Sequence, residues 1–279
     1  DIPDGIDKQD LNKFNTDIQK VAEKVKDAKA KGEKIDINLC QVTIPGTNLY
    51  CDDNLGIKRK DMPQFKGKPV PGSRAEKMPL NKDGEVDTEP VFREMLKQKG
   101  IKTIQTEIAA DQLKATQSEL GGDKVIGMMG ALEENPQHPS ITAPIFVSRD
   151  GYVIDGHHRW AAIVAYNASH PEEQIPMKVE VIDKDIKDAV EMCNQFAQDI
   201  GIAAKKQGET TGTVGEEPKA AEVKPNEKDP ESNVKTFKGE QSGKEIKTIE
   251  FEGGGYLFGT VHRDEKMVDD IVNQVKATV

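Results

Sequence analysis

The segment at residues 144–166 constrains the fold of this chain more than any other. An apolar run at 144–148 is followed by Arg149-Asp150-Gly151, a hairpin turn signal, and by a second apolar run at 152–154. The alanine-rich stretch at 158–166 then has the composition and spacing of a buried helix. Two strands joined by a tight turn and followed at once by a helix predict an α+β fold.

Apolar spacing predicts further elements on both sides of this segment. Helices are expected over 91–99, 123–132 and 186–198, and strands over 101–108 and 177–181. Residues 110–115 are typical of a turn or a short helix. We therefore expect residues 91–202 to form the main domain.

The first 90 residues are expected to contain one helix and an irregular arm. Asp7 or Asp10 is a candidate cap for a helix that runs to about Lys31, and its apolar residues recur every three or four positions. This stripe fits either a partner-binding coiled coil or a helix packed on its own domain, and we favour the second because three heptads are few for an isolated coiled coil. Residues 35–90 have many turn signals and are expected to lie over a neighbouring domain.

The arm contains the densest positive stretch of the chain. Two interpretations are open, a surface that follows phosphates and a solvated loop, and we favour the loop. The residues are Lys58, Arg59, Lys60, Lys66, Lys68, Arg74 and Lys77.

The last part of the chain is expected to be a linker and a small extension. Residues 203–245 are rich in Glu, Lys, Gly, Thr and Pro, contain one aromatic residue and have no apolar period, which predicts a flexible linker. Residues 246–279 predict a short ββα piece, with strands over 246–251 and 256–261 and a helix over 265–275. A piece of this size is expected to dock on the main body.

Composition excludes several classes of protein. The 279 residues carry a net charge of −10, so no overall positive field is available to hold nucleic acid. No apolar run is long enough for a membrane span, and the absence of a CxxC pair argues against a four-ligand zinc site. Cys40 and Cys51 could pair around Pro45-Gly46, but we expect reduced thiols in a cytoplasmic protein. The N-terminus has no signal pattern, and a segment before it stays open because the chain lacks a first Met.

The candidate chemistry lies at the start of the helix that follows the hairpin. Asp155-Gly156-His157-His158-Arg159 places a glycine and three donor-bearing side chains where helix N–H groups have no intrahelical partner, which suits a phosphate. Asp155 is a candidate to bind a divalent ion carried by a nucleotide or to take a proton from a hydroxyl group. His157 and His158 are candidate acids or bases. The structural alternative is that Asp155 only caps the helix and pairs with Arg159.

These residues carry a resemblance to a known family. Residues 101–185, and above all the Pro144-Ile145 strand, the hairpin and the Asp155–Arg159 turn before an alanine-rich helix, resemble the ParB/sulfiredoxin superfamily, including its ParB-like nuclease domains. The resemblance implies a small mixed sheet with flanking helices. It also implies that Gly156, His157, His158 and Arg159 hold nucleotide phosphates, with Lys124 as a further phosphate contact.

The same resemblance restricts which reactions of the superfamily are expected of this chain. Sulfiredoxins have a cysteine where this chain has His157, so sulfinic-acid reduction is not expected. The chromosome-partitioning members carry Gly-Glu-Arg-Arg at this turn and a downstream helix-turn-helix domain, neither of which is found here. In the free-serine kinases of the superfamily, an aspartate of the turn and an upstream glutamate serve the acceptor hydroxyl. Asp155 matches the aspartate, and Glu119 or Glu107 is a candidate for the glutamate.

Three functional hypotheses follow. The first is a phosphotransferase or NTP hydrolase that uses ATP, ADP or CTP with Mg²⁺ bound through Asp155, with Glu119 among the catalytic candidates. The second is a DNA nuclease in which His157 or His158 acts at the scissile phosphate and Asp155 holds a metal ion. The third is a non-catalytic component of a phage or mobile-element assembly, associated with DNA or a nucleotide and contacting a protein partner through its N-terminal helix. The expected location is the cytoplasm, or a virion if the chain is of phage origin.

Overall fold

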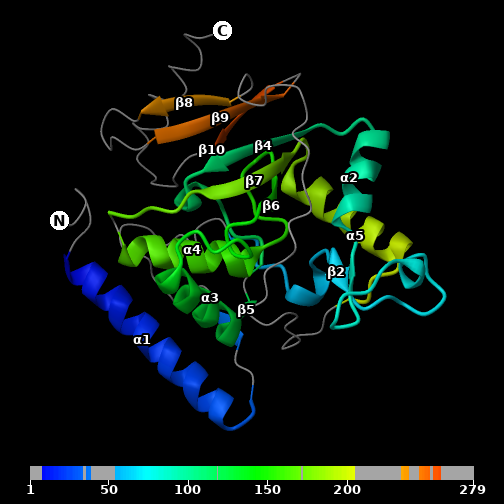
Figure 1. The fold of residues 1–279 in the computed structure, drawn as a ribbon. Helices are drawn as coiled ribbons and strands as arrows, with labels where there is room; N and C mark the ends of the chain where they lie inside the picture. Colours follow the sequence, from blue (N-terminus) through cyan, green and yellow to red (C-terminus); the bar gives the residue numbers. More distant parts are fainter. Residues whose placement is uncertain are drawn as a thin grey trace.

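A three-stranded mixed sheet lies at the centre of the described structure (Figure 1). The computed structural model describes residues 8–33, 36–38, 54–117, 119–170, 172–204, 234–238, 245–251 and 254–258. In the sheet, β7 (Met177–Ile182) lies between β4 (Thr103–Ile108) and β6 (Ile145–Ser148). β4 is antiparallel to β7, and β6 is parallel to it. The expected α+β class is confirmed.

Each face of this sheet is covered by a layer of helices. Alternate residues of β6 explain this, because Ile145 and Val147 belong to one apolar cluster and Phe146 to the other. On the first face lie α3 (Gly122–Glu134) and α4 (His157–Ser169). On the second lie α2 (Glu89–Gln98) and α5 (Ile186–Ile200). The four helices and the three strands agree with the predictions to within a few residues at each end.

The N-terminal helix α1 (Lys8–Ala30) packs on the first layer. Val25 is buried, and Val21 packs against the apolar cluster that contains α3 and α4. After α1, β1 (Asp36–Asn38) pairs with β5 (Glu119–Gly121), the strand just before α3. The helix is therefore packed on its own domain, as the favoured interpretation predicts.

Residues 54–90 enter the second apolar cluster. Phe65 is 1% exposed, and its ring lies 4.6 Å from that of Phe92 in α2 and 5.2 Å from that of Phe146 in β6, measured between centroids. Ala75 and Val86 are buried in the same cluster. The segment is therefore part of the core of the main body, although its polar composition suggests a surface arm. Its short elements are η2 (Arg59–Asp61), β2 (Lys66–Gly67), η3 (Ala75–Lys77) and β3 (Val86–Asp87), with β2 antiparallel to β3.

The return of the hairpin at 152–154 is less regular than predicted. Val153 forms an antiparallel bridge with Val147, while Tyr152 forms a parallel bridge with Lys114. The Val153 N–H donates to the Lys114 carbonyl over 3.0 Å, so the segment divides its hydrogen bonds between two neighbours and forms no continuous strand. The predicted turn or short helix at 110–115 begins with η4 (Ala110–Gln112).

The C-terminal part contains a separate antiparallel sheet in the order β10-β9-β8. β9 (Glu245–Phe251) and β10 (Gly254–Phe258) agree with the two predicted strands, displaced by up to three residues. β8 (Val234–Lys238) lies inside the range 203–245 that the sequence predicts as a flexible linker, and it pairs antiparallel with β9. The predicted helix at 265–275 lies outside the described residues, as do Cys40 and Cys51. Among the helices of the described part, none is long and apolar enough to cross a bilayer.

Candidate functional site

The start of α4 is fixed by a glycine in the left-handed conformation. Gly156 has φ 94° and ψ 22° and precedes the first helical residue. A Cβ at this position would overlap the side chain of Ile145 in β6, so the turn lies directly against the sheet. No described side chain caps this end of the helix. Asp155 therefore does not cap it, and the partial positive charge of the helix dipole lies at this end.

His157 points into the protein. Its ring is 4% exposed, and its Nε2 accepts hydrogen bonds from the backbone N–H groups of Thr116 and Gln117, each over 3.1 Å. Burial, and secondarily the charge of Arg59, lowers the pKa of His157 to about 3. An Nε2 that accepts two amide hydrogens carries no proton at neutral pH. The geometry thus gives His157 a supporting role, different from the acid or base that its sequence position suggests.

His158 is also turned inward. It is 7% exposed, and its Nε2 accepts the backbone N–H of Gly121 over 3.0 Å. Because Gly121 ends β5 and precedes α3, this bond joins the starts of α3 and α4. The two histidines therefore contact different backbone segments and do not form a shared metal site.

The segment that supports His157 is itself held by the N-terminal part of the chain. The Leu55 N–H donates to the Ala115 carbonyl over 3.3 Å, and the Ile57 N–H donates to the Thr116 carbonyl over 2.9 Å. Thr116 in turn donates its hydroxyl to the Val153 carbonyl over 2.6 Å. Nothing in the sequence pattern indicates these contacts, because they join residues about 40 to 60 positions apart.

Arg159 and Asp155 lie on the outer side of the same turn. The Arg159 Nη1 donates to the carbonyls of Ala143 and Pro144 over 3.1 and 3.3 Å, and its Nη2 lies 3.6 Å from the Asp155 Oδ2. The side chain of Arg159 is 16% exposed and that of Asp155 is 33% exposed. The pairing that the structural alternative predicts is therefore present, and both groups still reach the surface.

A second set of charged residues lies beside this pair. The Lys66 Nζ is 3.0 Å from the Glu89 Oε1, the Arg93 Nη2 is 3.3 Å from the Glu89 Oε2, and the Arg93 Nε is 2.8 Å from the Glu180 Oε2. Burial raises the pKa of Glu89, but the charges of Lys66, Arg159 and Arg93 together lower it below its usual value. Glu89 thus lies within electrostatic reach of Arg159.

We call these six residues the outer face: Lys66, Glu89, Arg93, Asp155, Arg159 and Glu180. Gly156, His157 and His158 are the inner face. The sequence pattern indicates Asp155 and Arg159, and Lys66 only as one member of the basic stretch of the arm. It gives no indication of Glu89, Arg93 or Glu180. The signal that could have indicated Glu89 is its place at the start of a helix that follows a basic segment.

Three further residues were predicted to belong to the site: Glu119, Lys124 and Glu107. Glu119 belongs to β5, two residues before the Gly121 N–H that contacts His158, and its side chain lies outside the described part. Lys124 is half-buried in the first turn of α3. Glu107 is exposed on β4, where it is paired in register with Lys178. The structure therefore gives no position to the Glu119 carboxylate.

The carboxylate of Asp155 suits a metal ion that arrives already bound to a ligand. In the described part of the chain, no three His, Cys, Asp or Glu side chains are grouped as metal ligands. Mg²⁺ needs only one or two protein carboxylates when substrate phosphates supply its other ligands. Asp155 is exposed enough for such a contact, so the outer face fits a nucleotide-borne Mg²⁺.

The comparisons with known proteins add no relative. No family model, no curated protein and no solved structure matches this chain.

Proposed function

We propose that the chain binds a nucleotide through its phosphates at the start of α4 and acts as a nucleotide-dependent phosphotransferase or NTP hydrolase. The observation that carries the proposal is the outer face, where Arg159 and Asp155 reach the surface beside a helix N-terminus without a side-chain cap. The resemblance to the ParB/sulfiredoxin superfamily, with its mixed sheet and its turn before an alanine-rich helix, supports the same assignment.

The proposed roles follow from charge and exposure. The N–H groups of the first turn of α4 and the Arg159 guanidinium bind phosphate oxygens, and Gly156 allows them a close approach. Asp155 faces the bound phosphate and either contacts its Mg²⁺ or accepts the proton of an attacking hydroxyl. Mg²⁺, when bound with the nucleotide, neutralises the charge that develops on the phosphates.

Glu89 is the upstream carboxylate that this proposal uses. Its side chain is 16% exposed and its pKa is lowered, so it is ionised at neutral pH. It lies within reach of the charge of Arg159, whereas Glu107 is exposed on β4 and paired in register with Lys178. We therefore assign to Glu89 the place for which the sequence suggested Glu119 or Glu107.

The nuclease hypothesis has less support. It requires His157 or His158 to exchange a proton at the scissile phosphate, but the Nε2 atoms of both rings already accept backbone N–H groups inside the protein. In our proposal the two histidines hold the turn in place. A non-catalytic component that binds a nucleotide would use the same outer face, and release of phosphate from the bound nucleotide distinguishes the two roles.

Nucleotide binding is tested by thermal unfolding of the full chain with ATP, ADP and CTP in the presence of Mg²⁺. We expect at least one of them to raise the Tm, because a ligand that binds only the folded state stabilises it. Arg159→Ala removes a side chain that donates hydrogen bonds to the phosphates and is expected to abolish the shift in Tm. Asp155→Asn is expected to retain the shift and to lose phosphate release from the bound nucleotide.

The matched control is Arg74→Ala, which removes an exposed arginine in the groove between α2 and α5 and is expected to bind nucleotide as the wild type does. Fluorescence of Trp160, which is the only tryptophan and is fully buried next to the turn, checks that each variant is folded. The proposal fails if none of the nucleotides shifts the Tm, or if Arg159→Ala binds like the wild type. Cleavage of plasmid DNA that depends on Arg159 would replace it with the nuclease hypothesis.

A further inference from the structure

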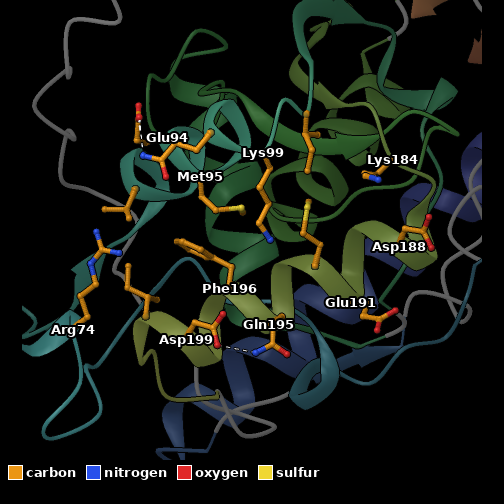
Figure 2. A pocket seen from close by; sticks show the side chains of 15 residues that line it. Arg74, Glu94, Met95, Lys99, Lys184, Asp188, Glu191, Gln195, Phe196 and Asp199 are labelled. Atoms are coloured by element: carbon orange, nitrogen blue, oxygen red, sulfur yellow. Dashed lines mark hydrogen bonds between the residues drawn. The ribbon is translucent and has the colours of Figure 1, made fainter. Parts of the chain in front are cut away.

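A groove runs between α2 and α5 on the second face of the sheet (Figure 2). Its volume is about 860 Å³, and its floor is apolar, formed by Val91 and Met95 of α2 with Met192, Phe196 and Ile200 of α5. The groove does not include Glu89 or Arg93, which lie on the outer face. An inference about it therefore goes beyond the proposed function and does not depend on it.

The floor is incompletely covered by the chain itself. Phe196 is 8% exposed and Ile200 is 2% exposed, but Val91, Met95 and Met192 above them are only partly buried. Two of these partly exposed side chains are methionines, which suit a binding surface because unbranched side chains adapt to different apolar partners. An open apolar strip between two helices has the shape that accepts a third helix.

The two edges of the groove differ in charge. The α5 edge carries Asp188, Glu191, Gln195 and Asp199 at intervals of three or four residues, which places them along one side of the helix. The α2 edge mixes Glu94, Gln98 and Lys99. Within the part of the chain that the structure describes, Asp188 and Glu191 form no hydrogen bond or ion pair. The α5 edge is thus acidic. Arg74, Lys99 and Lys184 also line the groove, and in the described part of the chain none of them forms an ion pair with this edge.

We propose that the groove binds an amphipathic helix of a partner protein. The helix presents apolar residues at i, i+4 and i+7 to the floor and a flank of Lys or Arg to the α5 edge. α5 is 15 residues long, and so a partner helix of about four turns covers the strip. Charge complementarity selects a basic flank, because an acidic helix would leave Asp188 and Glu191 facing like charges.

The test uses the full chain and two synthetic helical peptides of about 16 residues, a length at which designed helices form in water. Both peptides carry leucines at the spacing above, one with lysines and one with glutamates on the flank that faces α5. We expect the basic peptide to bind at least about tenfold more tightly in fluorescence anisotropy, with an affinity that falls as salt is added.

Groove variants assign the binding to this surface. Met192→Lys places a charge on the floor of the groove and is expected to lower the affinity for the basic peptide by about tenfold or more. Asp188→Lys combined with Glu191→Lys is expected to reverse the preference between the two peptides. The matched control is Glu134→Lys, a charge reversal at an exposed position at the end of α3, which is expected to change neither affinity.

Three results would overturn the proposal. The first is that the basic peptide fails to bind or binds no better than the acidic one. The second is that Met192→Lys leaves the affinity unchanged. The third is that the chain sediments as a dimer that Met192→Lys converts to a monomer, which would assign the groove to a second copy of the chain. Failure of nucleotide binding would leave all of these measurements interpretable, because the peptide assay contains no nucleotide.

Discussion

Within the α4 turn, residues of the inner face and of the outer face follow one another in sequence but differ in burial and in their hydrogen-bond partners. On the inner face, His157 and His158 are buried and accept hydrogen bonds from backbone amides. On the outer face, Asp155 and Arg159 are partly exposed and pair with each other at 3.6 Å. Successive residues of a helix point about 100° apart, so neighbouring polar residues at its start can face the core and the solvent in turn.

We expect this difference to separate residues that support the turn from residues that contact the proposed ligand. The inner residues satisfy amides of distant segments, and so their loss is expected to cost stability. Asp155 and Arg159 of the outer face form an ion pair near water, where a pair contributes little to stability, and so their loss is expected to change ligand binding instead. This separation between the two faces can be tested by urea unfolding, with the fluorescence of the buried Trp160 as the signal.

The largest expected effect is that of Gly156→Ala. The alanine would have to adopt φ 94° and its Cβ would overlap Ile145, so we expect the free energy of unfolding to fall by about 3 kcal/mol. Gly100→Ala is the matched control, since Gly100 also has a positive φ, 66°, but a Cβ added there would have nothing within 4 Å. We expect the control to lose only about 1 kcal/mol. Equal losses at both sites would show that contact with Ile145 does not hold the turn.

The second effect is a pH dependence that comes from His157. The pKa of His157 is about 3 in the folded chain against 6.5 for the free group. Below pH 6.5 the unfolded chain therefore takes up a proton that the folded chain does not, and the stability from this residue falls as the pH falls toward 3. We expect wild-type stability to drop by about 2–3 kcal/mol from pH 6.5 to 4.5 through this group.

The variant His157→Gln isolates this contribution. We expect it to be about 2 kcal/mol less stable at neutral pH, because it supports the Thr116 and Gln117 amides less well, and to lose less stability on acidification than the wild type. His138→Gln, a change at a half-buried ring that contacts the Ser140 hydroxyl, is expected to keep the wild-type pH dependence. An unchanged pH dependence in His157→Gln would contradict the buried, neutral state of this ring.

The sequence predicted the regular elements of the main body well. In α3 and α5 the apolar period depends only on residues three or four apart, and so it is visible in one sequence. The sheet strands β6 and β7 were found in the same way from their apolar runs. The mixed order of the sheet, with β7 antiparallel to β4 and parallel to β6, depends on pairings between strands that are far apart in sequence.

The parts that failed depend on contacts between distant residues. Phe65 stands in a polar segment, and only its contacts with Phe92 and Phe146 make that segment part of the core. Residues 152–154 have the pattern of a strand, but Lys114 takes part of their backbone pairing. No local pattern specifies such pairings.

The sequence predicts the candidate site as one turn, and the structure divides the residues of this turn between an inner and an outer face. The pattern Asp155–Arg159 indicated five polar or conformationally special positions without showing which side chains face inward. The backbone amides of Thr116, Gln117 and Gly121 decide this, because they occupy both imidazoles. Glu89 was missed because its position near Arg159 depends on how α2 packs on the sheet.

The smallest expected effect on stability is that of Asp155→Asn, and it is the strictest test of the outer face. The carboxylate is 33% exposed and pairs with Arg159 at 3.6 Å, and Arg159 keeps its bonds to the Ala143 and Pro144 carbonyls when the charge is removed. We therefore expect urea unfolding of the nucleotide-free variant to show a loss of no more than about 1 kcal/mol. A loss as large as that in His157→Gln would mean that Asp155 also supports the turn, and the separation between the two faces would not hold.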